Sequence, residues 1–123
     1  MSFQQWQIEM LNLVNAERAR YHRRPLNLDI RLCHSAQEHS NYQAHTNAMT
    51  HNDSSGPLMT RVQRRVPNIR GCAENVAWNQ PDVRSVVQGW INSPGHHRNM
   101  LGEYNIVGFG IQNKYWTQVF ALA

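Results

Sequence analysis

The apolar pattern of this chain changes its period over roughly the last twenty residues, and that change restricts the fold more than any other feature. Between residues 106 and 112 apolar side chains alternate with two glycines, and residues 115 to 121 are rich in aromatic and β-branched side chains. Alternation with a period of two indicates β-strands, and the intervening Gln112-Asn113-Lys114 is typical of a hairpin loop. The sequence therefore predicts an antiparallel hairpin here.

Most of the preceding chain follows a helical period instead. The clearest case begins at Pro81-Asp82, after which the apolar residues from Val83 to Ile91 recur at i, i+3, i+4, i+7 and i+8. Similar spacing predicts a helix from Gln5 to about Arg20. Asp29 is suited to cap another helix that runs to about residue 48, and a short helix is expected over residues 58–62.

Helices and strands together indicate one α+β domain over residues 1–123. A short strand is expected over residues 75–78, which gives a small antiparallel sheet of three strands with helices packed on its faces. The composition, 41% hydrophobic and 16% charged, fits one globular domain. No stretch approaches the roughly 18 apolar residues of a transmembrane segment. Residues 1–6 lack the regions of a secretory signal, so either the protein is not exported or its signal is missing from this sequence.

The chain is basic, with a formal charge of +4 and a pI near 9.6, and its cations are eleven arginines and one lysine. Such a balance favours acidic partners through long-range attraction. Arginines cluster at residues 18–24 and 61–70, but no nucleic-acid motif accompanies them. They are therefore interpreted as solvated basic faces, and no specific nucleic-acid partner is expected; a nonspecific nucleic-acid binder would show steep salt dependence.

Three side chains with acid–base or metal-binding chemistry, His51, Glu74 and His96, lie at the predicted ends of elements. Element ends are where a rigid scaffold aims side chains into a cleft, so we expect a single site. For His51 the alternative is a favourable charge at the end of the preceding helix. Glu74 is expected to be half-buried beside a histidine or arginine, and the alternative is a purely structural ion pair with Arg61 or Arg98.

Other polar residues near these segments are given structural roles. His34, His39 and His45 lie on the predicted helix at spacings of five and six, which point them in different directions, so they are interpreted as packing or surface histidines. Asn75 and Asn99 are expected to hydrogen-bond backbone groups in turns.

Five motifs in order along the chain carry a resemblance to a known family. They are Leu13-Val14-Asn15-Ala16-Glu17-Arg18 with Pro25-Leu26, His51 with Gly56 and Arg61, Ala73-Glu74-Asn75-Val76-Ala77, Trp90 to Leu101, and Tyr115-Trp116-Thr117-Gln118-Val119-Phe120. Together they cover nearly the whole chain and resemble the CAP superfamily of cysteine-rich secretory, antigen 5 and pathogenesis-related proteins, in its bacterial-type short form. The resemblance implies an α-β-α sandwich and an extracellular location.

The resemblance also implies a central cleft, which in animal and plant members is lined by two histidines and two acidic residues. His51 and Glu74 match two of these positions. Ser93 or a neighbour occupies the position of the second acid, and Tyr115 that of the second histidine, so both are further cleft candidates. His96, typical of bacterial members, is the expected substitute ligand.

Two imidazoles with one carboxylate or water give a half-open coordination sphere that suits Zn²⁺ or another divalent metal, with His51 and His96 as the expected ligands. His97 is a weaker cleft candidate because its Cβ vector on the same turn points elsewhere. We expect a binding module for a lipid, glycan or peptide. The alternative is a metal-dependent hydrolase in which Glu74 acts as general base, but the missing second acid favours binding.

Two cysteines, Cys33 and Cys72, do not form a CxxC pair, so no structural zinc site on thiolates is expected. The helix that starts near Cys33 is roughly 22 Å long at ~1.5 Å per residue. The resemblance places His51 beside Glu74, and hence near Cys72 and far from Cys33. No disulfide is expected.

Overall fold

The computed structural model describes residues 2–123. In chain order its elements are α1 (Gln5–Arg20), β1 (Asn27–Leu28), α2 (Ile30–Thr46), α3 (Leu58–Arg65), β2 (Gly71–Trp78), α4 (Val83–Ile91), α5 (Pro94–Met100), β3 (Ile106–Gln112) and β4 (Tyr115–Leu122). The strands form one sheet in the order β1-β3-β4-β2. β4 pairs antiparallel with both β3 and β2, whereas β1 runs parallel to β3.

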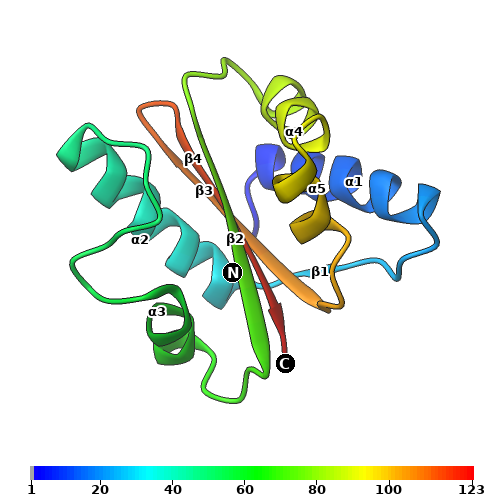
Figure 1. Ribbon diagram of the computed structural model, residues 1–123, viewed down its shortest axis with the longest axis horizontal. Helices are drawn as coiled ribbons and strands as arrows, with labels where there is room; N and C mark the ends of the chain where they lie inside the picture. Colours follow the sequence, from blue (N-terminus) through cyan, green and yellow to red (C-terminus); the bar gives the residue numbers. More distant parts are fainter. Residues whose placement is uncertain (1) are drawn as a thin grey trace.

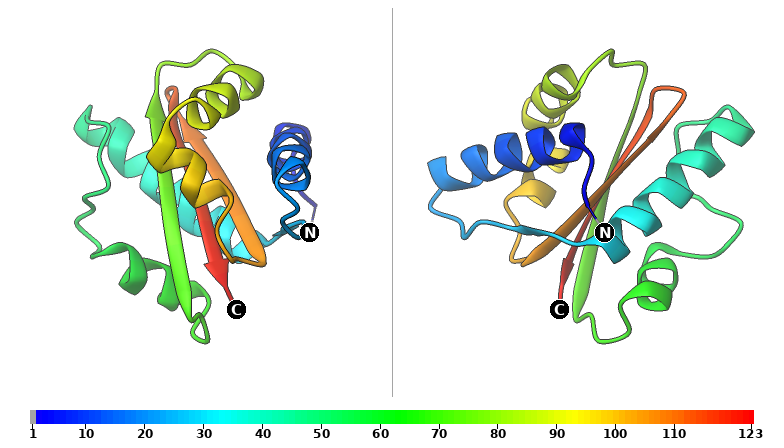
Figure 2. Two further views of the ribbon diagram at one scale, coloured as in Figure 1. Left: turned by 45° about the vertical axis from the view of Figure 1, so that its right-hand side comes forward. Right: turned by 180° about the vertical axis from the view of Figure 1, so that it is seen from behind.

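Helices cover both faces of this sheet (Figure 1). α2 and α3 pack on one face, while α1, α4 and α5 pack on the other, as the rotated views in Figure 2 also show. Trp90 and Phe109 belong to the core on the α1 side. Leu32 and Val119 belong to the smaller core beneath α2 and α3. The architecture is therefore an α-β-α sandwich.

The α+β fold class is confirmed, with local differences from the prediction. The sheet is mixed, because β1 adds a parallel strand that the sequence did not predict; two residues are too few to show a period. β2 begins at Gly71, four residues before the predicted strand, and α3 continues to Arg65. No helix among residues 2–123 is long and apolar enough to cross a membrane.

The hairpin turns over two residues. Asn113 and Lys114 have φ values of 51° and 62°. Positive φ at both central positions is characteristic of a type I′ turn, whose twist matches that of the flanking strands. The turn holds β4 against β3 from Gln112↔Tyr115 to Ile106↔Ala121.

The backbone of α2 lies directly on the glycines of β3. A Cβ atom added at Gly108 would stand 2.1 Å from the carbonyl carbon of Leu32, and one added at Gly110 would stand 2.5 Å from the Cα atom of Gln37. Only glycine permits this approach. The alternation seen in the sequence therefore has two purposes: the apolar residues fill the core on the α1 side, and the glycines accept a helix on the other.

Cys33 and Cys72 are both free thiols. Cys33 is buried, and burial raises the pKa of its thiol to about 11. Such a thiol is inert at neutral pH.

Candidate functional site

Glu74 is the charged centre of the site. It lies on β2, an edge strand, on the face covered by α2 and α3, and its side chain is 1% exposed. Arg61 donates from Nη1 to Oε2 (3.0 Å) and from Nη2 to Oε1 (3.4 Å), while His51 Nδ1 donates to Oε1 (2.8 Å). Both carboxylate oxygens are therefore engaged, as a buried carboxylate requires.

Arg61 is part of this buried network and not of a solvated face. It is 6% exposed, and besides Glu74 it donates from Nε to the carbonyl of Gly56 (3.0 Å) and from Nη2 to the carbonyl of His51 (3.2 Å). The expectation of a solvated basic face is wrong at this position, because α3 and the preceding loop close over the guanidinium group. Arg61 thereby fixes the loop that carries His51.

His39 completes the network and was not identified as a site residue from the sequence. Its ring is fully buried on α2, with Nδ1 2.8 Å from Asp53 Oδ2, Nε2 2.7 Å from the carbonyl of Thr50, and Nε2 3.7 Å from Glu74 Oε1. Asp53 and the carbonyl of Thr50 are its hydrogen-bond partners, whereas Glu74 at 3.7 Å is too distant for a hydrogen bond and lies within reach of an electrostatic contact only. No local pattern pairs residues 39 and 53; only the folded chain does.

The charges in the network shift one another's pKa values. Burial alone would raise the pKa of Glu74, but the hydrogen bonds from His51 and Arg61, together with the charges of His39 and Arg61, outweigh it and lower that pKa below its usual range. The hydrogen bond to Glu74 raises the pKa of His51. Hydrogen bonding to an ionised group favours the charged form, so Glu74 is a carboxylate at neutral pH.

His51 presents the opposite edge of its ring to solvent. Its side chain is 58% exposed, although the carboxylate that holds Nδ1 is buried. Within residues 2–123, Nε2 of His51 has no hydrogen-bond partner. A buried carboxylate that fixes one ring nitrogen and leaves the other free is the arrangement that orients a histidine for a metal or a ligand.

His96 approaches the same edge strand from the other face. The side chain of Asn75, the neighbour of Glu74 on β2, donates to the carbonyl of His96 (3.1 Å) and so ties α5 to the strand. His96 Nδ1 lies 2.9 Å from Ser93 Oγ. Burial, and then repulsion from His51, lower the pKa of His96. His51 contacts Glu74 and His96 is tied to Asn75, so the two histidines flank neighbouring positions of β2 from its two faces.

Two other predicted cleft candidates have different surroundings. His97 Nε2 lies 2.7 Å from Glu17 Oε2, and its ring stands edge-on to Tyr21 with the centroids 5.1 Å apart. It thus joins α5 to α1. Tyr115 is buried at the C-terminal end of β2, with its ring 5.9 Å from that of Trp78.

Asn75 and Asn99 belong to a buried polar chain. Asn99 Nδ2 donates to Asn75 Oδ1 (2.9 Å), and Asn75 Nδ2 donates to Gln118 Oε1 (2.9 Å) on the neighbouring strand. Asn75 does bond a backbone carbonyl, as expected, but from a strand and not from a turn. This chain fixes α5, and hence His96, relative to the sheet.

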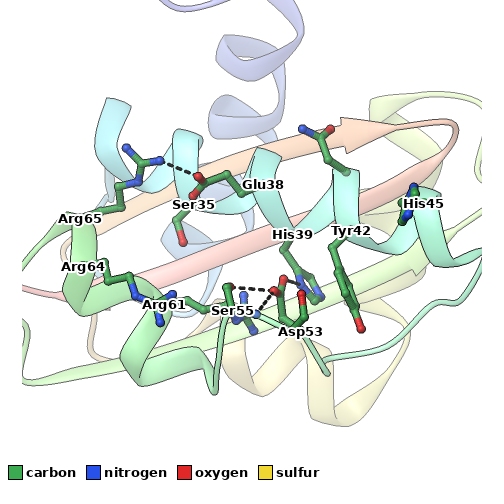
Figure 3. A pocket seen from close by; sticks show the side chains of 12 residues that line it. Ser35, Glu38, His39, Tyr42, His45, Asp53, Ser55, Arg61, Arg64 and Arg65 are labelled. Atoms are coloured by element: carbon green, nitrogen blue, oxygen red, sulfur yellow. Dashed lines mark hydrogen bonds and ion pairs between the residues drawn. The ribbon is translucent and has the colours of Figure 1, made fainter.

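A groove of about 540 Å³ lies beside the network, between α2 and α3 (Figure 3). His39, Asp53 and Arg61 form its inner wall, and charged or polar side chains, among them Tyr42 and Arg64, form its sides. Across residues 2–123, no group of three or more histidine, cysteine, aspartate or glutamate side chains is arranged to hold a metal ion. Any metal at His51 and His96 would thus lack a third histidine, cysteine or carboxylate ligand from the described residues.

The sequence model of the CAP, or cysteine-rich secretory protein, family matches residues 11–120. This chain belongs to the CAP family. Among curated relatives, the CAP domain is 31% identical over 114 residues to the uncharacterized membrane protein YlbC of Bacillus subtilis and 29% identical over 116 residues to YkwD of the same organism. Both matches cover 91% of the chain, but 33% and 45% of those relatives, so the chain spans less than half of their length.

Solved structures show the same CAP fold. An extracellular protein of Bacillus anthracis that contains an SCP domain superposes with a TM-score of 0.90 at 30% identity, over 95% of this chain and 40% of that one. An outer surface protein of Borrelia burgdorferi gives a TM-score of 0.85 at 17% identity, over 94% of this chain and 90% of that one. At that identity the second likeness establishes the fold alone.

Proposed function

We propose that this CAP domain is an extracellular binding module whose ligand meets the protein at the His51–His96 edge of β2. The observation that carries the proposal is the half-exposed imidazole of His51, held by a carboxylate that is itself buried and fully partnered. Burying a carboxylate is costly unless it is paired and hydrogen-bonded, and the pairing of Glu74 with His51 also holds that ring in one orientation. The carboxylate of Glu74 holds Nδ1 of His51 and thereby leaves Nε2 of that ring facing outward.

A divalent metal fits the donor set in part. Two neutral imidazole nitrogens suit Zn²⁺, and Nδ1 of both His51 and His96 is engaged elsewhere, which directs coordination to Nε2. With two protein ligands, the remaining positions belong to water or to a donor atom of the ligand. When bound, the metal would supply a positive centre that attracts anionic or carbonyl groups of the ligand.

The arrangement favours binding over hydrolysis. A general base must be free to take a proton from a water molecule. Glu74 has both oxygens engaged by Arg61 and His51, and its pKa is lowered, so it is a positioning group and a poor proton acceptor. The metal-dependent hydrolase is therefore the second candidate.

The groove beside the site favours a polar ligand. Its walls carry an ion pair between Arg65 and Glu38 (2.7 Å) together with Arg64 and His45. Charged walls suit hydrogen-bonding ligands better than an acyl chain. We therefore propose a glycan or peptide in preference to a lipid. The likeness to the extracellular Bacillus anthracis protein supports a location outside the cell.

The test is a zinc titration by calorimetry on the wild type, His51→Ala, His96→Ala and the matched control His34→Ala, which removes an exposed histidine of α2. We expect binding near one equivalent in the wild type and the control, and none in the other two variants. Loss in all three variants, or equal binding in all four proteins, would contradict a metal site at this edge. Zinc-dependent hydrolysis of peptide or ester substrates would instead establish the second candidate.

A further inference from the structure

A second pocket lies at the end of the sheet where β2 begins and β4 ends. Its volume is about 560 Å³, and four of its lining residues are the arginines Arg18, Arg23, Arg24 and Arg70. Segments far apart in the sequence form it: the end of α1 and the loop after it, the residue before β2, and the connection between α5 and β3. It shares no lining residue with the groove beside Glu74.

Arg18 is the innermost cation of this pocket and is only 1% exposed. It donates from Nε to the carbonyl of Arg24 (2.8 Å), and from Nη1 to the carbonyls of Met100 (2.7 Å) and Gly102 (2.9 Å). Within residues 2–123 it makes no ion pair, and its Nη2 group has no hydrogen-bond partner. The expectation of a solvated basic face is thus wrong here too.

The charge of Arg18 is compensated only in part. Its three acceptors are neutral carbonyls, and those at the end of α5 contribute only the partial negative charge of a helix C-terminus. Burial, and then repulsion from Arg23, lower the pKa of the Arg18 guanidinium. Among residues 2–123 no carboxylate forms an ion pair with Arg18, although a buried cation normally has such a partner.

The rest of the pocket adds to the positive charge. Arg23, Arg24 and Arg70 are exposed at its mouth, and Glu103 is the one carboxylate in its lining. Four guanidinium groups around one carboxylate leave a net positive pocket. Guanidinium groups present paired N–H donors in a planar fork that matches the oxygens of a phosphate group, and several arginines favour a multiply charged anion.

We propose that this pocket is an anion site that takes a phosphate group, carried by a soluble phosphate compound or by a lipid headgroup. The buried Arg18 forms the floor, with its unpartnered Nη2 group available to the anion, and the exposed arginines close around it. The site is independent of the His51–His96 edge and adds a second binding function to the domain.

The test uses inorganic pyrophosphate as the probe, titrated by calorimetry at about 0.15 M salt so that unspecific attraction is screened. The variant Arg23→Ala/Arg70→Ala removes two charges from the pocket mouth and leaves Arg18 in place. The control Arg84→Ala/Lys114→Ala removes the same charge from α4 and the hairpin turn. We expect saturable binding that weakens about tenfold or more in the pocket variant and less than about twofold in the control.

A parallel sedimentation assay with phosphatidylglycerol and phosphatidylcholine vesicles distinguishes the two sources of the phosphate. If the protein co-sediments with phosphatidylglycerol vesicles and only the pocket variant loses this binding, the phosphate belongs to a lipid headgroup. If the protein binds pyrophosphate but does not co-sediment with the vesicles, the phosphate belongs to a soluble compound. The proposal is overturned if pyrophosphate shows no saturable binding, or if the control variant weakens binding as much as the pocket variant.

Discussion

At the scale of single residues, the site depends on how Glu74 is kept charged inside the protein. Its carboxylate is held by Arg61 from α3 and by His51 from the preceding loop, with His39 3.7 Å away. Removing one partner of such a network leaves an uncompensated charge in a place that water does not reach. The network is therefore both the support of the loop and the device that orients His51.

Replacing Arg61 by alanine should destabilise the protein by about 3 kcal/mol, because Glu74 then remains buried without its guanidinium partner. The measurement is urea unfolding followed by circular dichroism. Arg64→Ala is the matched control on the exposed side of the same helix and should change stability by less than about 0.5 kcal/mol. Equal effects of the two substitutions would show that the Arg61–Glu74 pair contributes little.

At the scale of elements, the decisive contact is that of α2 with β3. Gly108 and Gly110 give the helix a smooth backbone surface, and Asp29 caps the helix by accepting from the backbone N–H groups of Arg31 (2.8 Å) and Leu32 (3.4 Å). Because α2 carries His39, its distance from the sheet also sets the depth of the charge network beneath it.

Replacing Gly108 by alanine should therefore lower the free energy of unfolding by about 3 kcal/mol, since the new methyl group would overlap the backbone of α2 and not a movable side chain. Gly71→Ala is the matched control in a strand, because an added Cβ there has nothing within 4 Å. Thermal and urea unfolding of both variants measure the difference. A Gly108 variant as stable as the Gly71 variant would mean that α2 can move away from β3 at little cost.

At the scale of the whole molecule, one small sheet supports two separate polar regions. The edge of β2 carries the His51–His96 site, and the end at which β2 begins carries the arginine pocket. Between them lie the two apolar cores and two buried polar groups, the Asn99–Asn75–Gln118 chain and the Ser40–Thr117–Gln43 cluster. Cys33 is buried and Cys72 is half-buried, so the rate at which each thiol reacts reports how often local opening of the structure exposes it to solvent.

At pH 8, iodoacetamide should alkylate Cys33 of the native protein more slowly than it alkylates the half-buried Cys72. With the pKa of Cys33 raised to about 11 by burial, only a small fraction of that thiol is ionised at pH 8, and the fraction grows as pH rises toward 11. Mass spectrometry of digested samples measures both sites, and unfolded protein provides the control in which the two rates converge. Faster labelling of Cys33, or an intact mass two hydrogens lighter before reduction, would contradict the structure.

The sequence alone determined to which family the chain belongs and which helices and strands form, apart from the two-residue β1. The bounds of α1, α4 and β3, and the capping role of Asp29, follow from periodicity and from hydrogen bonds between neighbouring residues, which a linear pattern records directly. The motif around Glu74 indicated a carboxylate beside a histidine or an arginine, and the fold supplies both.

Only the tertiary structure decided which charges are buried and what they contact. His39 meets Asp53 and Glu74, and Arg18 lies beneath the loops at the end of the sheet, because helices and loops distant in sequence close over them. A histidine or arginine on a helix has the same local pattern whether it faces water or a carboxylate. Its partner is set by the packing of another element, and no spacing along the chain encodes that contact.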